Sequence, residues 1–180
     1  MTKQTIRTMT AVALFCCSGL AAFAQVVFAG TYSNIRYTTE HESGYQVQLW
    51  KCNGQVYGFL TVANGMQGDV PVGVIDHVTF DAATGKLSFT AKLTTGSDVV
   101  GPGVTQVDAK DLFKFDGMLT SKLLSGKLTH EDQATPEVPA TTVPLRLALI
   151  KDKPTPDHYA TPADLLAANQ PMLDDSGPKW

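Results

Sequence analysis

Cysteine is scarce in this chain of 180 residues, and its scarcity limits how the fold can be held together. Three cysteines occur, and two of them, Cys16 and Cys17, lie in an N-terminal apolar run that we expect to be removed. Only Cys52 would then remain, which excludes an intramolecular disulfide in the mature protein. The fold must therefore be stabilised by its core, and a chain of this length can bury one.

Other familiar signals are also missing. The sequence contains no Asn-x-Ser/Thr sequon, no glycine-rich phosphate or dinucleotide motif, no nucleophile motif and no zinc-ligand spacing. We therefore expect no cofactor and no metal. The net charge is −3 and becomes −5 when Lys3 and Arg7 are removed with the leader, which argues against nucleic acid as a partner.

The N-terminus has the pattern of a signal peptide. Lys3 and Arg7 precede the apolar run of residues 11–20, and Ala22-Phe23-Ala24 fits the small-x-small cleavage site. We predict a signal peptide over residues 1–24, cleavage near Ala24, and export to the periplasm or the cell exterior. The alternative is a retained anchor, for which the apolar run is short.

Asn53-Gly54 lies between two alternating runs, residues 45–50 and 56–63, and predicts a β-hairpin with a two-residue turn. That turn pairs Cys52 with Gln55 and fixes which residues share a face. The face predicted to point inward consists of Tyr45, Val47, Leu49, Gly58, Leu60 and Val62. The opposite face carries a surface aromatic patch of Trp50, Tyr57 and Phe59.

Eight strands follow from the same reasoning, over residues 28–37, 45–52, 55–63, 72–80, 86–94, 112–119, 122–129 and 142–150. We predict an all-β protein, an antiparallel eight-stranded up-and-down barrel over residues 25–150; the alternative is a two-sheet sandwich. By analogy alone, this architecture is similar to that of lipocalin- and avidin-type barrels. Residues 151–180 are predicted to be a linker, a short helix from an N-cap at Thr161 to Pro171, and a tail. Residues 95–110 are predicted to be a long mobile loop.

Charged residues alternate with the inward set on several strands, among them Lys86, Lys92 and Lys127. These side chains would contact lipid in a membrane barrel, so we predict no membrane span.

Asp76 shares its parity with Val74, Val78 and Phe80, which predicts an inward carboxylate that could contact a ligand. The alternative is a β-bulge that turns Asp76 outward and Ile75 inward. Tyr45, Phe113 and Phe115 complete the predicted ligand-binding set. Inward glycines at Gly58, Gly117 and Gly126 either leave room for a ligand or accommodate phenylalanine rings.

His41, His77 and His130 each lie beside an acidic residue. No spacing among them matches a metal site, and we interpret them as solvated side chains. The aromatic patch has two interpretations, a partner surface or a surface covered by Leu165, Leu166 and Leu173.

Three functions follow. The first is non-enzymatic binding of a small apolar or amphipathic ligand, which the sequence favours. The second is a barrel-type isomerase or cyclase that uses Asp76. The third is a protein-interaction module that uses the aromatic patch or the Gly-Pro-Gly loop at residues 101–103.

Overall fold

The computed structural model describes residues 25–66, 68, 70–100, 105–151, 154 and 156–180; the predicted signal peptide lies outside them. The barrel strands are β1 (Val26–Ser33), β3 (His41–Cys52), β4 (Gln55–Met66), β5 (Val72–Phe80), β6 (Lys86–Leu93), β9 (Asp111–Leu119), β10 (Leu123–Asp132) and β11 (Thr141–Ile150). Short strands β2 (Arg36–Tyr37), β7 (Ser97–Val100), β8 (Thr105–Asp108) and β12 (His158–Tyr159) and one helix, α1 (Pro162–Ser176), accompany them.

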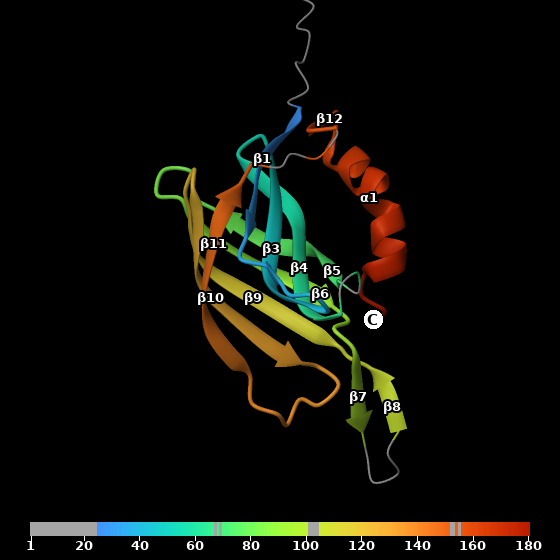
Figure 1. Ribbon diagram of the computed structural model, residues 1–180. Helices are drawn as coiled ribbons and strands as arrows, with labels where there is room; N and C mark the ends of the chain where they lie inside the picture. The colour runs from blue at the N-terminus through green and yellow to red at the C-terminus, as the bar shows by residue number, and fades with distance from the viewer. Residues whose placement is uncertain (1–24, 67, 69, 101–104, 152–153, 155) are drawn as a thin grey trace, which may run out of the picture.

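The eight long strands close into a barrel, as predicted. Each strand pairs antiparallel with the next from β3 to β11, and β1 pairs with both β11 and β3 to close the ring. Figure 1 shows the closed ring, with α1 on its outer side. An open meander would have two exposed sheet edges, and closure of the barrel removes them along most of the wall.

The predicted register of the first hairpin is confirmed. Cys52 pairs with Gln55 and Trp50 with Tyr57, and the turn residues Asn53 and Gly54 have φ values of 52° and 76°. A positive φ at both positions is what a two-residue hairpin turn requires. The register points the predicted apolar set into the barrel, where Val47, Leu49 and Leu60 are fully buried.

Side chains fill the middle of the barrel. The interior cluster contains Leu87, Phe89, Leu124, Leu147 and the other inward residues of all eight strands. Gly117 accommodates an aromatic ring, because a Cβ added there would lie 2.6 Å from Cζ of Phe115. The inward glycine at this position therefore makes room for a core side chain and leaves no ligand space.

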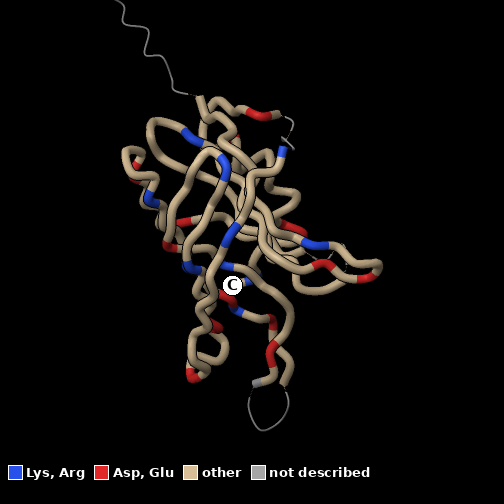
Figure 2. Tube along the Cα trace, turned by 60° about the vertical axis from the view of Figure 1, so that its left-hand side comes forward, with Lys and Arg blue, Asp and Glu red and all other residues tan. Residues whose placement is uncertain are grey.

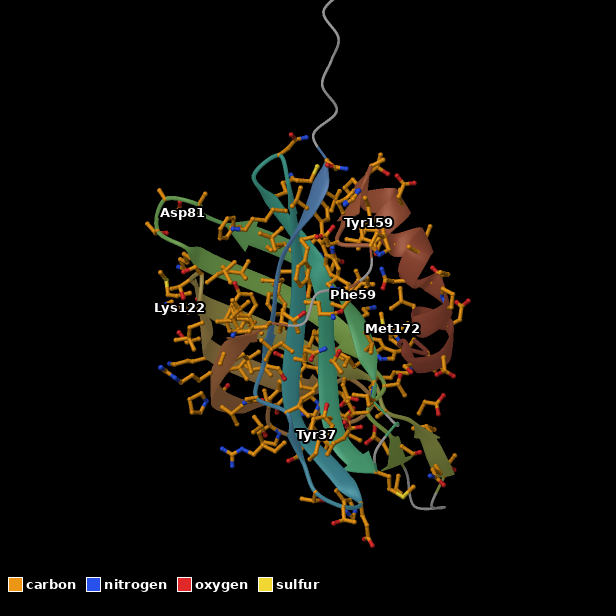
Figure 3. The ribbon with its side chains drawn as sticks, turned by 45° about the horizontal axis from the view of Figure 1, so that its top comes forward. Tyr37, Phe59, Asp81, Lys122, Tyr159 and Met172 are labelled. Carbon is orange, nitrogen blue, oxygen red and sulfur yellow. The ribbon has the colours of Figure 1, made fainter. Side chains whose placement is uncertain are left out.

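A second apolar cluster lies outside the barrel, beneath α1. It contains Val26, Trp50, Cys52, Phe59, Val72 and Leu165, with Tyr159, Met172 and Leu173 packed against it. Figure 3 shows Phe59, Tyr159 and Met172 close together between the barrel wall and the helix. Of the two interpretations of the aromatic patch, the exposed partner surface is wrong and the covered surface is confirmed: Trp50 and Phe59 are buried in one cluster with Leu165 and Leu173, and Tyr57 is half-buried.

Helix α1 begins as predicted and ends later than predicted. Thr161 and Asp164 form a reciprocal capping box, and Pro162 occupies the first turn. The helix continues through Pro171 to Ser176. Proline within a helix costs about 3 kcal/mol, but Met172 and Leu173 pack against the Trp50 cluster only if the helix continues.

The connections differ between the two ends of the barrel (Figure 1). Short turns join β3 to β4, β5 to β6 and β9 to β10 at one end. At the other end, longer segments join β1 to β3, β6 to β9 and β10 to β11. The β6–β9 connection, predicted to be a mobile loop, contains the β7–β8 hairpin instead. We call the end with the longer connections the mouth, since binding residues are concentrated on such loops.

Candidate functional site at the barrel mouth

A cavity of about 310 Å³ lies at the mouth, where the barrel wall is incomplete. Strand β1 ends at Ser33 and pairs with β11 only over Ala148–Ile150, so the first half of β11 has no neighbour on that side. Pro144 lies in this half. The Leu149 N–H donates to the carbonyl oxygen of Lys122, just before β10. Because N–H groups alternate in direction along a strand, the nitrogen of Pro144 points away from β10, and its missing N–H leaves no ladder bond to β10 unmade.

The cavity combines apolar walls with polar groups. Phe113, Leu128, Val143, Val62 and Tyr45 provide apolar surface, and Ser43, Asn64, Thr95, His130 and Thr141 provide hydrogen-bonding groups. Small-molecule sites are typically mostly apolar concavities with a few polar groups that orient the ligand.

Asp111 and His130 form the chemical centre of the cavity. Nε2–H of His130 donates to Oδ1 of Asp111 over 2.6 Å, and the Thr95 backbone N–H and hydroxyl both donate to Oδ2 at 2.8 Å. The Asp111 side chain is 4% exposed and that of His130 is 39% exposed. The imidazole also stacks on Phe113, with ring centroids 4.7 Å apart and an interplanar angle of 15°. The ring is therefore fixed in position and in tautomer.

Each group of the pair favours the charged form of the other. The hydrogen bond to Asp111 raises the pKa of His130, and burial opposes the rise. Burial raises the pKa of Asp111, but hydrogen bonds from His130 and Thr95 outweigh it, so this pKa lies below its ordinary value. Within the described part of the chain, Nδ1 of His130 has no hydrogen-bond partner, and when protonated it carries an N–H for a ligand.

The surroundings of this pair are acidic. Burial raises the pKa of Asp98, and the negative charges of Asp132 and Asp111 raise it further, while His130 opposes them. Oδ2 of Asp98 is buried and has no hydrogen-bond partner among the described residues. A carboxylate brought into this mouth would meet like charges, so the field favours an uncharged ligand group.

Two of the four predicted ligand-binding residues, Tyr45 and Phe113, line the mouth cavity. Phe115 lies deeper, stacks on Phe89 with centroids 5.0 Å apart, and belongs to the filled core. Asp76 does not point inward: of its two predicted positions, the alternative, in which a β-bulge turns it outward, is confirmed, since its side chain is 75% exposed on the outer wall. Asp76 pairs with Thr90, and an irregularity between Asp76 and Thr79 places Ile75 inside and Asp76 outside.

The pair of Asp111 and His130 was missed, although the alternation contains the signal. Asp111 has the same parity as Phe113 and Phe115, which were predicted to point inward. His130 has the same parity as Leu124 and Leu128 on the next strand. Asp111 lies just before the predicted strand 112–119 and was not considered, and the interpretation of His130 as a solvated side chain is wrong, since it is half-buried and bonded to Asp111. Among the described residues, no group of three or more His, Cys, Asp or Glu side chains is arranged to hold a metal ion.

The chain matches no family model, no curated protein and no solved structure. The analogy to lipocalin- and avidin-type barrels therefore rests on strand number alone.

In the residues that the structure describes, the one helix is neither long nor apolar enough to cross a membrane. Basic and acidic residues are interspersed along the chain trace (Figure 2).

Proposed function

We propose that this chain is an exported barrel that binds a small, uncharged amphipathic molecule in the mouth cavity and releases it unchanged. The observation that carries the proposal is the fixed, partly exposed imidazole of His130 in a cavity lined by both apolar and polar side chains. The apolar part of the ligand would contact Phe113, Leu128 and Val143. A carbonyl oxygen at its polar end would accept a hydrogen bond from Nδ1–H of His130.

The size and the charge of the cavity support this ligand class. A volume of about 310 Å³ is at the lower end of the range of small-molecule sites. The mouth has a negative field, which comes from Asp98, Asp111 and Asp132. This field disfavours a ligand carboxylate, so the group that accepts the hydrogen bond from His130 should be uncharged. Export is a separate part of the proposal and is supported by the leader pattern of residues 1–24.

The short ketone 2-heptanone is a suitable probe, because it has a carbonyl group and an apolar chain. Calorimetry on the mature protein at pH 6 should detect binding, and His130→Gln should weaken it by about fivefold to tenfold, the value of one lost hydrogen bond of this kind. His158→Gln is the matched control, since that exposed histidine lies on β12, outside the mouth lining. Equal affinities for the two variants would contradict the assignment.

An enzymatic function of the isomerase type is the second candidate, now centred on His130 instead of Asp76. The observation that favours it is the buried carboxylate that orients a histidine, an arrangement suited to general acid–base catalysis. In D₂O, an enzyme of this kind would exchange the protons next to the carbonyl of 2-heptanone at a rate that His130→Gln abolishes. Simple binding predicts exchange at the rate of the buffer alone.

A further inference from the structure

A larger groove, about 760 Å³ in volume, lies outside the barrel where β4 and β5 separate. Their ladder contains three pairs, from Phe59↔Val74 to Thr61↔Val72. Beyond Phe59 the two strands diverge, whereas β3 and β4 remain paired along their whole length. The groove follows this divergence and is bounded on its outer side by α1, through Pro162, Leu165 and Leu166.

The backbone of β5 explains the divergence. The ladder to β6 is irregular between Asp76 and Thr79, and His77 within it has a φ of 49°, which is unusual for a residue other than glycine. A bulge of this kind bends a strand and increases its twist. Strained backbone concentrates at binding sites, so the strained residue His77 on the groove supports a ligand site there.

The groove reaches apolar surface at two depths. Its floor includes Val56 and Ile75, which point into the barrel and are 3% and 5% exposed. They border the groove at the gap between β4 and β5. Its outer side includes Leu166, which is 40% exposed although it is a large apolar side chain. Val74, Val78 and Phe80 continue this apolar lining between the two levels. An alkyl chain in the groove would cover Leu166 and contact the floor.

Among the described residues that line the groove, the one cation is Lys92. Lys92 lines the groove, and its Nζ lies 4.3 Å from the centre of the Trp180 ring. Within the described residues, Lys92 makes no ion pair. Asp76 is already engaged, because the His77 backbone N–H donates to Oδ1 over 2.7 Å and the His77 ring nitrogen Nδ1 lies 3.2 Å from Oδ2.

We propose that this groove is a second binding site, which takes a linear amphipathic carboxylate. Its alkyl chain lies along the parted strands beneath Leu166, and its carboxylate pairs with Nζ of Lys92. The charge of Lys92 selects an anionic head group, in contrast to the acidic mouth. The volume of the groove falls within the usual range for ligands of this size.

Dodecanoate is the probe for this site, with affinity measured by calorimetry at pH 7 and low salt. Lys92→Gln should weaken binding by about threefold to fivefold, as expected for a partly exposed ion pair. Lys86→Gln, on the same strand but outside the groove lining, is the matched control and should have no effect. Leu166→Gln should weaken binding by about tenfold through lost apolar contact, and Asp76→Asn should strengthen it by removing a like charge.

The mouth provides the comparison that separates the two sites. His130→Gln should leave dodecanoate affinity unchanged, and Lys92→Gln should leave 2-heptanone affinity unchanged. Loss of dodecanoate binding in His130→Gln would overturn the proposal, because the probe would then occupy the mouth. Equal affinities for Lys92→Gln and Lys86→Gln, or no binding of dodecanoate to the wild-type protein, would also overturn it. The dodecanoate measurements do not depend on whether 2-heptanone binds, so the two proposals can fail separately.

Discussion

The buried carboxylate of Asp111 holds the imidazole of His130 at 2.6 Å, across two neighbouring strands at the mouth of the barrel. Thr95, from the connection after β6, contributes two further hydrogen bonds to the same carboxylate. Three segments of the chain therefore meet at one side chain. Asp111 both positions His130 and fastens the β6–β9 connection to the barrel.

The first prediction concerns the pKa of His130. In the wild-type protein this pKa is raised, chiefly by the hydrogen bond to Asp111. Asp111→Asn removes the negative charge and should lower the pKa of His130, which the pH dependence of its ring NMR signals would measure. An unchanged pKa in Asp111→Asn would show that the contact does not control the charge of His130.

The second prediction concerns stability against pH. The pKa of His130 is raised on folding, so its contribution is complete below about pH 6.5 and is lost as pH rises through the folded pKa. The pKa of Asp111 is lowered, so its contribution is complete above about pH 3.9 and is lost as pH falls through the folded pKa. Thermal unfolding should therefore show the largest gap between the wild type and Asp111→Asn between these two values.

The control for that series is His158→Gln, because His158 is exposed and its partner Asp157 is half-exposed. This variant should track the wild-type unfolding temperature across the whole pH range. A gap between the wild type and Asp111→Asn that stays unchanged as pH rises through the folded pKa of His130 would contradict the ion-pair account, since the imidazole loses its charge there.

The third prediction tests the packing of the barrel interior. A Cβ at Gly117 would lie 2.2 Å from the carbonyl oxygen of Ser125 and 2.6 Å from the Phe115 ring. Gly117→Ala should therefore destabilise the protein by about 1–3 kcal/mol through overpacking. Gly65→Ala is the matched control, because a Cβ there meets nothing within 4 Å. Urea unfolding of both variants measures the difference, and equal midpoints would contradict the packing described.

The fourth prediction tests whether α1 belongs to the folded unit. Leu165 is 1% exposed in the cluster around Trp50, whereas its neighbour Leu166 is 40% exposed. Leu165→Ala should cost about 2–5 kcal/mol of unfolding free energy, and the fluorescence of Trp50 should shift to the red as water reaches it. Leu166→Ala should change neither quantity. A neutral Leu165→Ala would mean that the helix does not stabilise the barrel.

Alternation and turn chemistry were sufficient to predict the barrel. Asn53-Gly54 determined one register, and that register determined the inward face of β3 and β4. Alternation left two positions open for Asp76, because a single extra residue near His77 reverses the faces along β5 and the side chains do not show where that residue lies. It also left two interpretations open for Trp50 and Phe59, whose exposure depends on where a helix more than 100 residues later in the sequence packs.

The mouth site was only half predicted. Tyr45 and Phe113 follow from parity, but the contact of Asp111 with Thr95 depends on how the β6–β9 connection folds back. The short strands β7 and β8 in that connection were not predicted, because residues 95–110 were interpreted as a mobile loop; the Gly-Pro-Gly at residues 101–103 lies outside the described residues. The same parity that identified Phe113 would have identified Asp111 and His130.

The most direct test of the central claim is the NMR spectrum of His130 during titration with 2-heptanone at pH 6. We predict that the Nδ1 signal of His130 shifts in a saturable way, together with the methyl signals of Leu128 and Val143, and that the effect fades as pH rises through the pKa of His130. Saturable binding that leaves the His130 and Leu128 signals unmoved, or no saturable binding at all, would contradict a ligand site at the barrel mouth.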